Sequence, residues 1–283
     1  MNDIPCKAIQ GSKAIKTVFI LGIGSDIGRS LAEQYSDEGY VVIGTCRSKG
    51  SVLGLEENPN ITILQCNLAE VNAIDALFED YRRLSTPWDL FISCIGNMNP
   101  IGRFFDLAFH EWQQSVIVNS VAQLHVLHGM YPLRRRGALC HVALMAGGGT
   151  NGTFRNYSAY CVSKIALIKM CELLDDENPD LNIFIVGPGW VRTKIHNQTI
   201  GNEVGSGENY RRTLEFFQSN NPGTSLKDIR KCIDWCIGEG KEGASGRNFS
   251  VVNDYWRSMG GELGKQLRRN INKFKLRRFL NEE

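Results

Sequence analysis

Short apolar runs alternate along the chain with stretches in which apolar residues recur at helical spacing. Residues 17–21 form the first run, and Ile27, Leu31 and Tyr35 then share one helix face that ends at Gly39. Continuous apolar strands that alternate with helices are typical of a parallel sheet covered on both faces. The pattern therefore predicts an α/β fold with one doubly wound parallel sheet. Further strands are predicted at residues 40–46, 61–65, 88–94, 138–144, 181–186 and 248–252.

The composition agrees with one large domain. At 283 residues and 42% hydrophobic content the chain can bury a sizeable core, and 29 glycines against 8 prolines favour tight strand-to-helix turns. No stretch reaches the length of a membrane span, and the first residues contain no apolar signal segment. Nine scattered cysteines look like reduced core residues rather than metal ligands. We therefore expect a cytoplasmic protein. Further helices are predicted at residues 71–81, 109–131 and 226–237, and around Tyr160.

The net charge of +2 hides a basic tail. Residues 257–283 hold eight Lys and Arg against three Glu, which gives +5 and leaves −3 for the rest of the chain. A uniformly basic surface for nucleic acid is therefore not expected. Leu263, Leu267, Ile271 and Phe274 recur at helical spacing and predict a basic amphipathic helix. Such a helix commonly docks on its own domain or a neighbouring subunit, and the alternative is contact with an anionic membrane surface.

A glycine-rich turn joins the first predicted strand to the first predicted helix. Its backbone N–H groups could approach a pyrophosphate at the helix N-terminus. The spacing fits Gly-x-x-x-Gly-x-Gly, with Asp26 in place of the middle glycine, better than Gly-x-Gly-x-x-Gly. The alternative is a plain glycine turn capped by Ser25 or Asp26. The candidate cofactor-binding residues of this turn are Gly22, Gly24, Ser25, Asp26, Ile27 and Gly28.

The second predicted strand ends at Cys46 and is followed by Arg47. An acidic residue at this place would bind the 2′-hydroxyl of an adenosine ribose, whereas a guanidinium suits a 2′-phosphate. The residue pattern therefore favours NADP over NAD. The alternative is a solvated arginine at a strand end.

Tyr160 and Lys164 lie four residues apart on a predicted helix, so the phenol and the ammonium share one face. A fixed positive charge nearby would lower the pKa of the phenol from its ordinary value of about 10. General acid–base chemistry then becomes feasible. Because such pairs also occur by chance on solvated helices, the surrounding motifs decide the interpretation.

Together these motifs resemble the short-chain dehydrogenase/reductase family in its compact, single-domain, Rossmann-like form, over about residues 15–255. The resemblance implies that Tyr160 and Lys164 are the catalytic pair and that Asn119 anchors a proton-relay water. It also implies a homodimer or homotetramer formed through the long helices. Gly96 alone remains of the Asn-Asn-Ala-Gly motif after the fourth strand. The further cofactor contacts that it implies are Asn67 and Leu68 near the adenine, and Pro188, Gly189 and Thr193 near the nicotinamide.

One departure from the family pattern is serious, because the catalytic serine after the fifth strand is missing. Counting from the strand puts its position at Leu144, and counting back from Tyr160 puts it at Ala146 or Gly147. The loop resembles a subgroup, with Ser-Gly-Gly-Gly-Ala-Thr, that is associated with surface-polysaccharide and nucleotide-sugar pathways. Thr150 or Ser158 could supply a hydroxyl, although neither stands at the expected place.

The residue pattern divides the chain into an extension at 1–14, a dinucleotide-binding domain at 15–256 and a basic helical tail at 257–283. Within the domain, the glycine- and asparagine-containing stretch at about 194–222 looks like a mobile lid over a small-molecule substrate. The cations around the inferred site would suit an anionic substrate such as a phosphorylated or nucleotide-linked sugar, or would simply be solvated. They are Arg155, Arg192, Lys194, His196, Arg211 and Arg212.

The implied activity is that of an NADP-dependent oxidoreductase, which transfers a hydride between nicotinamide and a carbonyl or secondary alcohol. The alternative is an NADP-binding protein with little or no turnover, a sensor or an assembly subunit, because the catalytic serine is missing. Retention of Tyr160, Lys164 and Asn119 together favours the enzyme. A sugar-nucleotide epimerase or dehydratase is a weaker alternative, because Ser25 breaks the Gly-x-x-Gly-x-x-Gly loop of those proteins.

Overall fold

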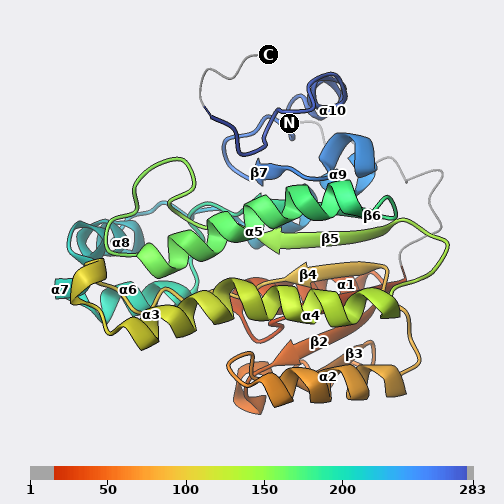
Figure 1. Ribbon diagram of the computed structural model, residues 1–283, viewed down its shortest axis with the longest axis horizontal. Coiled ribbons are helices and arrows are strands. Elements are labelled where there is room, and N and C mark those ends of the chain that lie inside the picture. Colours follow the sequence, from red (N-terminus) through yellow and green to blue (C-terminus); the bar gives the residue numbers. More distant parts are fainter. Residues whose placement is uncertain (1–15, 279–283) are drawn as a thin grey trace.

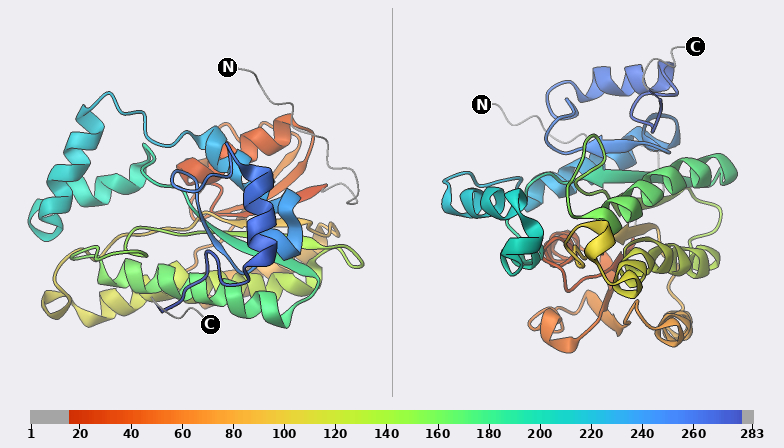
Figure 2. Two further views of the ribbon diagram at one scale, coloured as in Figure 1. Left: turned by 90° about the horizontal axis from the view of Figure 1, so that it is seen from above. Right: turned by 60° about the vertical axis from the view of Figure 1, so that its left-hand side comes forward.

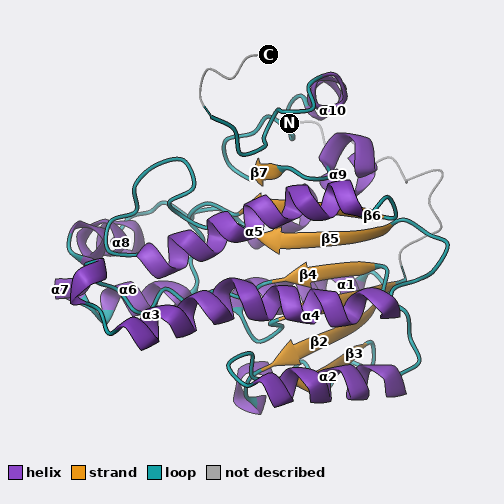
Figure 3. Ribbon diagram, viewed as in Figure 1, coloured by secondary structure: helices purple, strands orange, loops and turns teal. Residues whose placement is uncertain are grey.

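A seven-stranded parallel sheet forms the centre of the computed structural model, which describes residues 16–278 (Figures 1 and 3). The strand order is β3-β2-β1-β4-β5-β6-β7, so the connections change direction between β1 and β4. Ligands of doubly wound sheets bind at such a switch point, outside the carboxyl ends of the strands. The predicted fold class is confirmed. The strands are β1 (Thr17–Leu21), β2 (Val41–Cys46), β3 (Ile61–Gln65), β4 (Leu90–Ser93), β5 (Cys140–Met145), β6 (Leu181–Gly187) and β7 (Asn248–Ser250).

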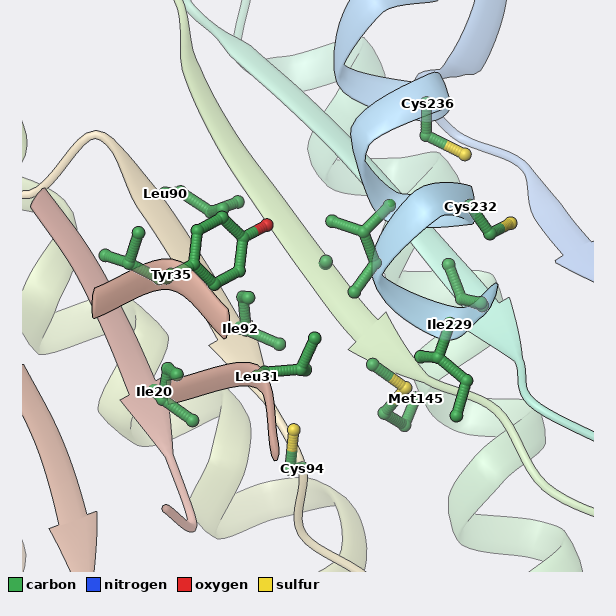
Figure 4. Packing of buried hydrophobic residues seen from close by; sticks show 14 of the residues in the cluster. Ile20, Leu31, Tyr35, Leu90, Ile92, Cys94, Met145, Ile229, Cys232 and Cys236 are labelled. Atoms are coloured by element: carbon green, nitrogen blue, oxygen red, sulfur yellow. The ribbon is translucent and has the colours of Figure 1, made fainter. Parts of the chain in front are cut away.

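Helices cover both faces of the sheet, which explains why the strands are apolar without alternation. In β1, Val18 and Ile20 pack under α1 and α9, whereas Phe19 and Leu21 pack under α2, α4 and α5. Figure 4 shows Leu31 and Tyr35 of α1 beside Ile20 of the sheet. A strand that is buried on both faces needs apolar residues at successive positions. The main covering helices are α1 (Asp26–Asp37), α2 (Val71–Arg83), α4 (Ala122–Met130), α5 (Ser158–Glu177) and α9 (Leu226–Ala244).

The helix predicted over residues 109–131 is interrupted in its middle. It begins as α3 (Phe109–Val116), passes through a π-helical turn at Ile117–Val121, and continues as α4 to a short 3-10 turn at Tyr131–Leu133. The Gln123 side chain, in the first turn of α4, donates to the carbonyl of Asn119 in the π-helical turn, 2.6 Å away. Single π-helical turns are frequent at functional sites, and this one contains the candidate residue Asn119.

The stretch predicted to be a mobile lid, residues 194–222, is mostly helical. A 3-10 turn at Lys194–His196 leads into α6 (Asn197–Ile200), α7 (Glu203–Ser206) and α8 (Glu208–Gln218). Figure 2 shows these helices projecting beyond the carboxyl ends of the strands. The asparagines and glycines of this stretch cap short helices, as Asn202 does when it accepts the N–H of Gly205 at 2.9 Å.

The basic tail docks on its own domain, which is one of the placements that the sequence left open. Helix α10 (Gly260–Arg269) buries Leu263 and Leu267 against α9. The helix ends earlier than predicted, so Ile271 does not continue its apolar face and is 71% exposed. Beyond it, the carbonyl of Phe274 accepts the N–H of Asn248 in β7 at 2.9 Å. The predicted extension at residues 1–14 lies outside the described residues.

The sequence predicts no membrane-spanning helix, and it predicts cysteines that are reduced core residues rather than metal ligands. Among residues 16–278, no helix has both the length and the apolar character needed to cross a membrane. The cysteines of this part of the chain are unpaired thiols, and seven of the eight are buried. Within the same residues no group of three or more His, Cys, Asp or Glu could hold a metal ion.

Candidate active site

A cavity of about 1330 Å³ lies outside the carboxyl ends of the strands. It runs from the turn after β1 and the end of β2 to the N-terminal turn of α5 and the lid helices. Most residues predicted from the sequence line it, but Gly28 and Asn119 do not. The predicted residues that line it are Gly22, Gly24, Ser25, Asp26, Ile27, Arg47, Asn67, Leu68, Gly96, Tyr160, Lys164, Pro188, Gly189 and Thr193.

The glycine turn caps α1, and its glycine positions have no room for a Cβ. Ser25 is the N-cap of α1, and its Oγ accepts the N–H of Gly28 at 3.0 Å. Gly22 has φ +88°, a conformation that favours glycine, and a Cβ on Gly28 would lie 2.3 Å from the Gly22 carbonyl oxygen. Gly28 therefore permits the close packing of the turn rather than touching a ligand. The sequence left a capped glycine turn as an alternative, and the structure shows that the turn is capped and also lines the cavity.

These residues fit the pyrophosphate of a dinucleotide. A helix N-terminus offers unpaired N–H groups and the positive end of the helix dipole to an anion. Here α1 begins at Asp26 at the edge of the cavity, next to the switch point between β1 and β4. The small residues of the turn would let the backbone approach a phosphate closely.

The end of β2 offers a positive charge to the same cavity. Arg47 is exposed, lines the cavity and follows the buried Cys46. Beside it, Ser48 and Asn67 add polar groups, although the Asn67 amide also donates to Glu70 at 2.7 Å. The two residues that follow β2 directly are Arg47 and Ser48, so no carboxylate stands at this sequence position to bind a ribose 2′-hydroxyl.

Tyr160 and Lys164 are both buried at the other end of the cavity, with 7% and 2% of their surfaces exposed. The Lys164 ammonium lies 5.7 Å from the centre of the Tyr160 ring and donates to the carbonyls of Ile95 at 2.9 Å and Met145 at 3.0 Å. Burial lowers the pKa of Lys164 to about 8. It therefore holds its proton weakly, and the two carbonyls fix its position.

The predicted fall in the pKa of Tyr160 is wrong for this structure. Burial raises the pKa of the phenol well above its usual value, because desolvation disfavours the charged form. The ammonium of Lys164 is directed at two carbonyls and does not offset that cost. The phenol is consequently protonated at neutral pH and can donate a proton.

Of the three positions that the sequence left open for the missing serine, Ala146 and Gly147 line the cavity and Leu144 does not. A Cβ built on Gly147 would lie 2.2 Å from the Tyr160 hydroxyl, so the phenol rests directly against this glycine. Of the two suggested replacements, Thr150 lines the cavity and donates to the Gly147 carbonyl at 3.0 Å. Ser158 instead accepts the indole N–H of Trp112 at 3.0 Å and does not line the cavity. Thr150 is thus the hydroxyl of the two that shares a cavity with Tyr160.

Asn119 lies beneath the cavity and does not line it. It is completely buried, accepts the N–H of Asn97 at 2.8 Å and donates to the carbonyl of Asn97 at 2.7 Å. These two bonds fix the loop after β4, which lines the cavity with Gly96 and Asn97. The side chain therefore acts on the site through Asn97.

Of the six cationic residues expected around the substrate, three line the cavity: Lys194, His196 and Arg212. Arg192 does not line the cavity. Its guanidinium donates to carbonyls in the last turn of α8, at Phe216 and Phe217, and just after it, at Ser219 and Asn221. Arg211 pairs with Glu208 and Glu215 on the surface of α8. Arg155 is not among the lining residues either.

The structure adds contacts that the sequence analysis missed. The Tyr157 hydroxyl bonds the Thr199 hydroxyl at 2.9 Å and donates to Ser206 at 3.2 Å, which ties the start of α5 to the lid helices. The Gln198 side chain accepts the N–H of Met98 at 2.6 Å. None of these three contacts had a signal in the sequence, because each joins residues that are 42 or more positions apart.

Comparisons with known proteins agree on one family. A family model described as short chain dehydrogenase matches residues 16–203. An NADPH-dependent pterin aldehyde reductase from Arabidopsis thaliana is 22% identical over 199 residues, which cover 68% of this chain and 81% of that protein. An NAD-dependent glycerol dehydrogenase from Listeria innocua is 20% identical over 247 residues, which cover 85% and 93%.

The fold has close counterparts among solved structures. A short chain dehydrogenase/reductase from Saccharomyces cerevisiae superposes with a TM-score of 0.74 and 19% sequence identity. The match covers 84% of this chain and 96% of the yeast chain. At this identity the likeness supports the fold and not a substrate.

Proposed function

The chain belongs to the short-chain dehydrogenase family and is an NAD(P)-dependent oxidoreductase, and from that premise we propose that it uses NADP to reduce a carbonyl group to a secondary alcohol or to catalyse the reverse reaction. When bound, the dinucleotide supplies the hydride through its nicotinamide ring. The residues of this chain bind the dinucleotide and transfer the proton.

The observation that carries the proposal is the buried Tyr160–Lys164 pair in the wall of the cavity. Burial keeps the Tyr160 phenol protonated, so it can donate to an oxygen on which negative charge develops. The Lys164 ammonium lies 5.7 Å from the centre of the Tyr160 ring. It does not ionise the resting phenol, but its positive charge favours the phenolate that remains after the proton has been transferred to the substrate.

The missing serine hydroxyl would slow this reaction without abolishing it. Removing one donor to a developing oxyanion typically costs a factor of about 10² to 10³ in rate. Thr150 lines the same cavity and its hydroxyl can rotate away from the Gly147 carbonyl, so we propose it as the second donor to the substrate oxygen.

Arg47 supports NADP as the cofactor. Its exposed guanidinium lines the cavity where β2 ends, the place at which a 2′-phosphate would lie. The relatives do not decide this point, because one is named for NADPH and another for NAD.

The lid helices support a small substrate with an anionic group, such as a sugar phosphate or a nucleotide-linked sugar. Arg212 of α8 lines the substrate end of the cavity and forms no ion pair with the residues that the structure describes. A guanidinium so placed can bind a phosphate or carboxylate with two parallel hydrogen bonds. In this proposal residues 194–222 close over the substrate, and exposed apolar residues such as Val121 and Val162 on the long helices serve a homodimer or homotetramer.

A second candidate function is dinucleotide binding with little or no turnover, and Gly147 is the observation that favours it. Gly147 lies directly against the Tyr160 hydroxyl and has no side chain that could polarise a substrate carbonyl there. Such a protein would serve as a sensor or as a subunit of an assembly.

The two candidates are separated by comparing the parent with Tyr160→Phe. We expect both proteins to bind NADPH equally in a fluorescence titration, and we expect NADPH consumption with a panel of aldehydes, ketones and phosphorylated sugars to fall at least about 100-fold in the variant. The absorbance at 340 nm reports that consumption. Equal rates in parent and variant would overturn the enzymatic role of Tyr160. Tight NADPH binding with no consumption in the parent would favour the second candidate.

A further inference from the structure

The glycine turn carries a negative charge at the place where an anion should bind. Asp26 is the first residue of α1, lines the cavity and stands where the family pattern has a glycine. A carboxylate at a helix N-terminus is favourable for the helix by itself. A pyrophosphate at the same helix end would nevertheless meet a like charge, which weakens binding unless a cation offsets it.

Lys194 supplies such a cation from the far side of the cavity. Its backbone N–H donates to Oδ2 of Asp26 at 2.6 Å, and its Nζ lies 3.6 Å from Oδ1. The same Nζ donates to the carbonyl of Gly24 at 2.6 Å. One residue of the segment after β6 thus contacts both the carboxylate and the backbone of the glycine turn, across 168 positions of sequence.

The surroundings fix Lys194 in this place. It begins the 3-10 turn Lys194–His196, in which the His196 ring stacks on Trp190 with 5.3 Å between ring centres. The Nε2 of His196 donates to the Val191 carbonyl, 3.0 Å away. The backbone bond to Asp26 orients the carboxylate independently of the lysine side chain. The charge of Lys194 and the geometry of Asp26 can therefore be changed separately.

We propose that Lys194 is a positioning residue that neutralises Asp26, so that the glycine turn accepts the pyrophosphate of the dinucleotide. The proposal rests on the proposed dinucleotide function and goes beyond it, because it assigns a role to a lysine outside the turn and explains how the turn tolerates an acid. Its distinguishing consequence is that Lys194 matters only while Asp26 is charged. A lysine that bound the phosphate itself would matter whatever stood at position 26.

The test is a double-mutant cycle with Asp26→Asn, Lys194→Met and the double variant. Asparagine keeps an oxygen that can accept the Lys194 N–H, so Asp26→Asn removes the charge and keeps the shape. NADPH dissociation constants are measured by fluorescence titration at low salt, with thermal melting as the check that each variant folds. Lys49→Met, on the 3-10 turn after β2, is the matched control for loss of a lysine near the nucleotide end.

We expect Lys194→Met to weaken NADPH binding about tenfold, and Asp26→Asn to bind as tightly as the parent or more tightly. The double variant should bind within about threefold of Asp26→Asn, since nothing remains for Lys194 to neutralise. Because Asp26 and Lys194 are 34% and 56% exposed, the loss in Lys194→Met should also shrink at high salt.

Two results would overturn this inference while leaving the proposed function intact. A tenfold loss from Lys194→Met that persists in the Asp26→Asn background would mean that the lysine binds the phosphate directly. Equal affinities in all four proteins would mean that the contact has no role in binding. A parent that binds neither NADPH nor NADH would overturn the proposed cofactor, and the role of Lys194 with it.

Discussion

The two ends of the cavity are built from different kinds of chemical groups. The nucleotide end consists mainly of backbone and empty space: a helix N-terminus, the positive φ of Gly22 and the absent side chain of Gly28. The catalytic end depends on two buried side chains, Tyr160 and Lys164, whose pKa values burial shifts in opposite directions.

This difference explains where the chain departs from its family. A site made of backbone tolerates a substitution when a neighbour offsets it, as Lys194 does for Asp26. A proton-transfer site has less freedom, because a missing hydroxyl can be replaced only by another donor that reaches the same substrate oxygen, as we propose for Thr150. Four variants test this difference between the two ends, beginning with the one expected to have the largest effect.

Gly28→Ala tests whether space rather than chemistry makes the nucleotide end. The added Cβ would lie 2.3 Å from the Gly22 carbonyl oxygen, which is fixed backbone, so the turn must deform. We expect NADPH affinity to fall at least about 100-fold in a fluorescence titration, since misplaced N–H groups lose the anion. Gly50→Ala is the control, because a Cβ there meets nothing within 4 Å. Full affinity in Gly28→Ala would refute a backbone-made site.

Lys164→Met tests the cost of the charge at the catalytic end. The folded pKa of Lys164 is about 8 and the unfolded value is about 10.4, so the buried charge destabilises the parent fully below pH 8. As pH rises from 8 towards 10.4, the folded parent releases this proton before the unfolded chain does, and its stability rises. Relative to the variant, the parent should gain roughly 2 kcal/mol in free energy of unfolding between pH 6.5 and 9.5.

Urea unfolding at the two pH values measures this change, and Lys169→Met provides the control. Lys169 lies on the same helix, is half-exposed and pairs with Glu172 at 3.0 Å. Its removal should leave the pH dependence of the parent unchanged. A parent and Lys164→Met that respond identically to pH would contradict the burial of a titrating ammonium.

Gly147→Ser asks whether the catalytic end can take back the family's hydroxyl. The new Cβ would lie 2.2 Å from the Tyr160 hydroxyl, so Tyr160 must move from its present place. We expect a lower melting temperature and a roughly tenfold lower kcat, because the proton donor is displaced from the substrate. Gly152→Ser, where a Cβ meets nothing within 4 Å, should change neither quantity. An increased kcat with an unchanged melting temperature would mean that Tyr160 adjusts freely.

Arg47→Ala should have the smallest effect, because the side chain it removes is exposed and solvent weakens its charge. We expect about a fivefold loss of NADPH affinity and no change for NADH, measured in parallel titrations. Lys49→Ala serves as the neighbouring control. An equal loss for both dinucleotides would show that Arg47 does not distinguish the 2′-phosphate.

The sequence predicted the sheet and the nucleotide turn because both depend on local pattern. Strands buried on two faces are visible as apolar runs, and Gly22 and Gly28 are required by a single turn. The helical lid escaped prediction because its short helices are also held by distant partners, such as the Ile101 carbonyl that accepts from the Asn202 side chain. The end of α10 escaped prediction because Ile271 continues the apolar spacing beyond Arg269, where the helix stops.

The sequence placed Tyr160 and Lys164 together at the catalytic end, but it did not predict the direction of the Tyr160 pKa shift. Spacing alone puts Tyr160 and Lys164 on one helix face, but it cannot show that the ammonium is directed at the carbonyls of Ile95 and Met145. The direction of the Tyr160 pKa shift depends on that orientation and on burial. Arg192 is a similar case, since its sequence position suggested substrate binding and its guanidinium instead caps carbonyls at the end of α8.

The contact between the tail and β7 bears on the solution behaviour of shortened forms of the chain. β7 is the last strand of the sheet, and an unpaired strand edge is a template for aggregation. The Phe274 carbonyl occupies one N–H of that edge, and the buried Arg247 binds the carbonyls of Leu267 and Lys273. Cutting the chain after Trp256 would leave this arginine without these partners and the strand edge open, so we expect the shortened chain to associate edge to edge more readily than the full chain.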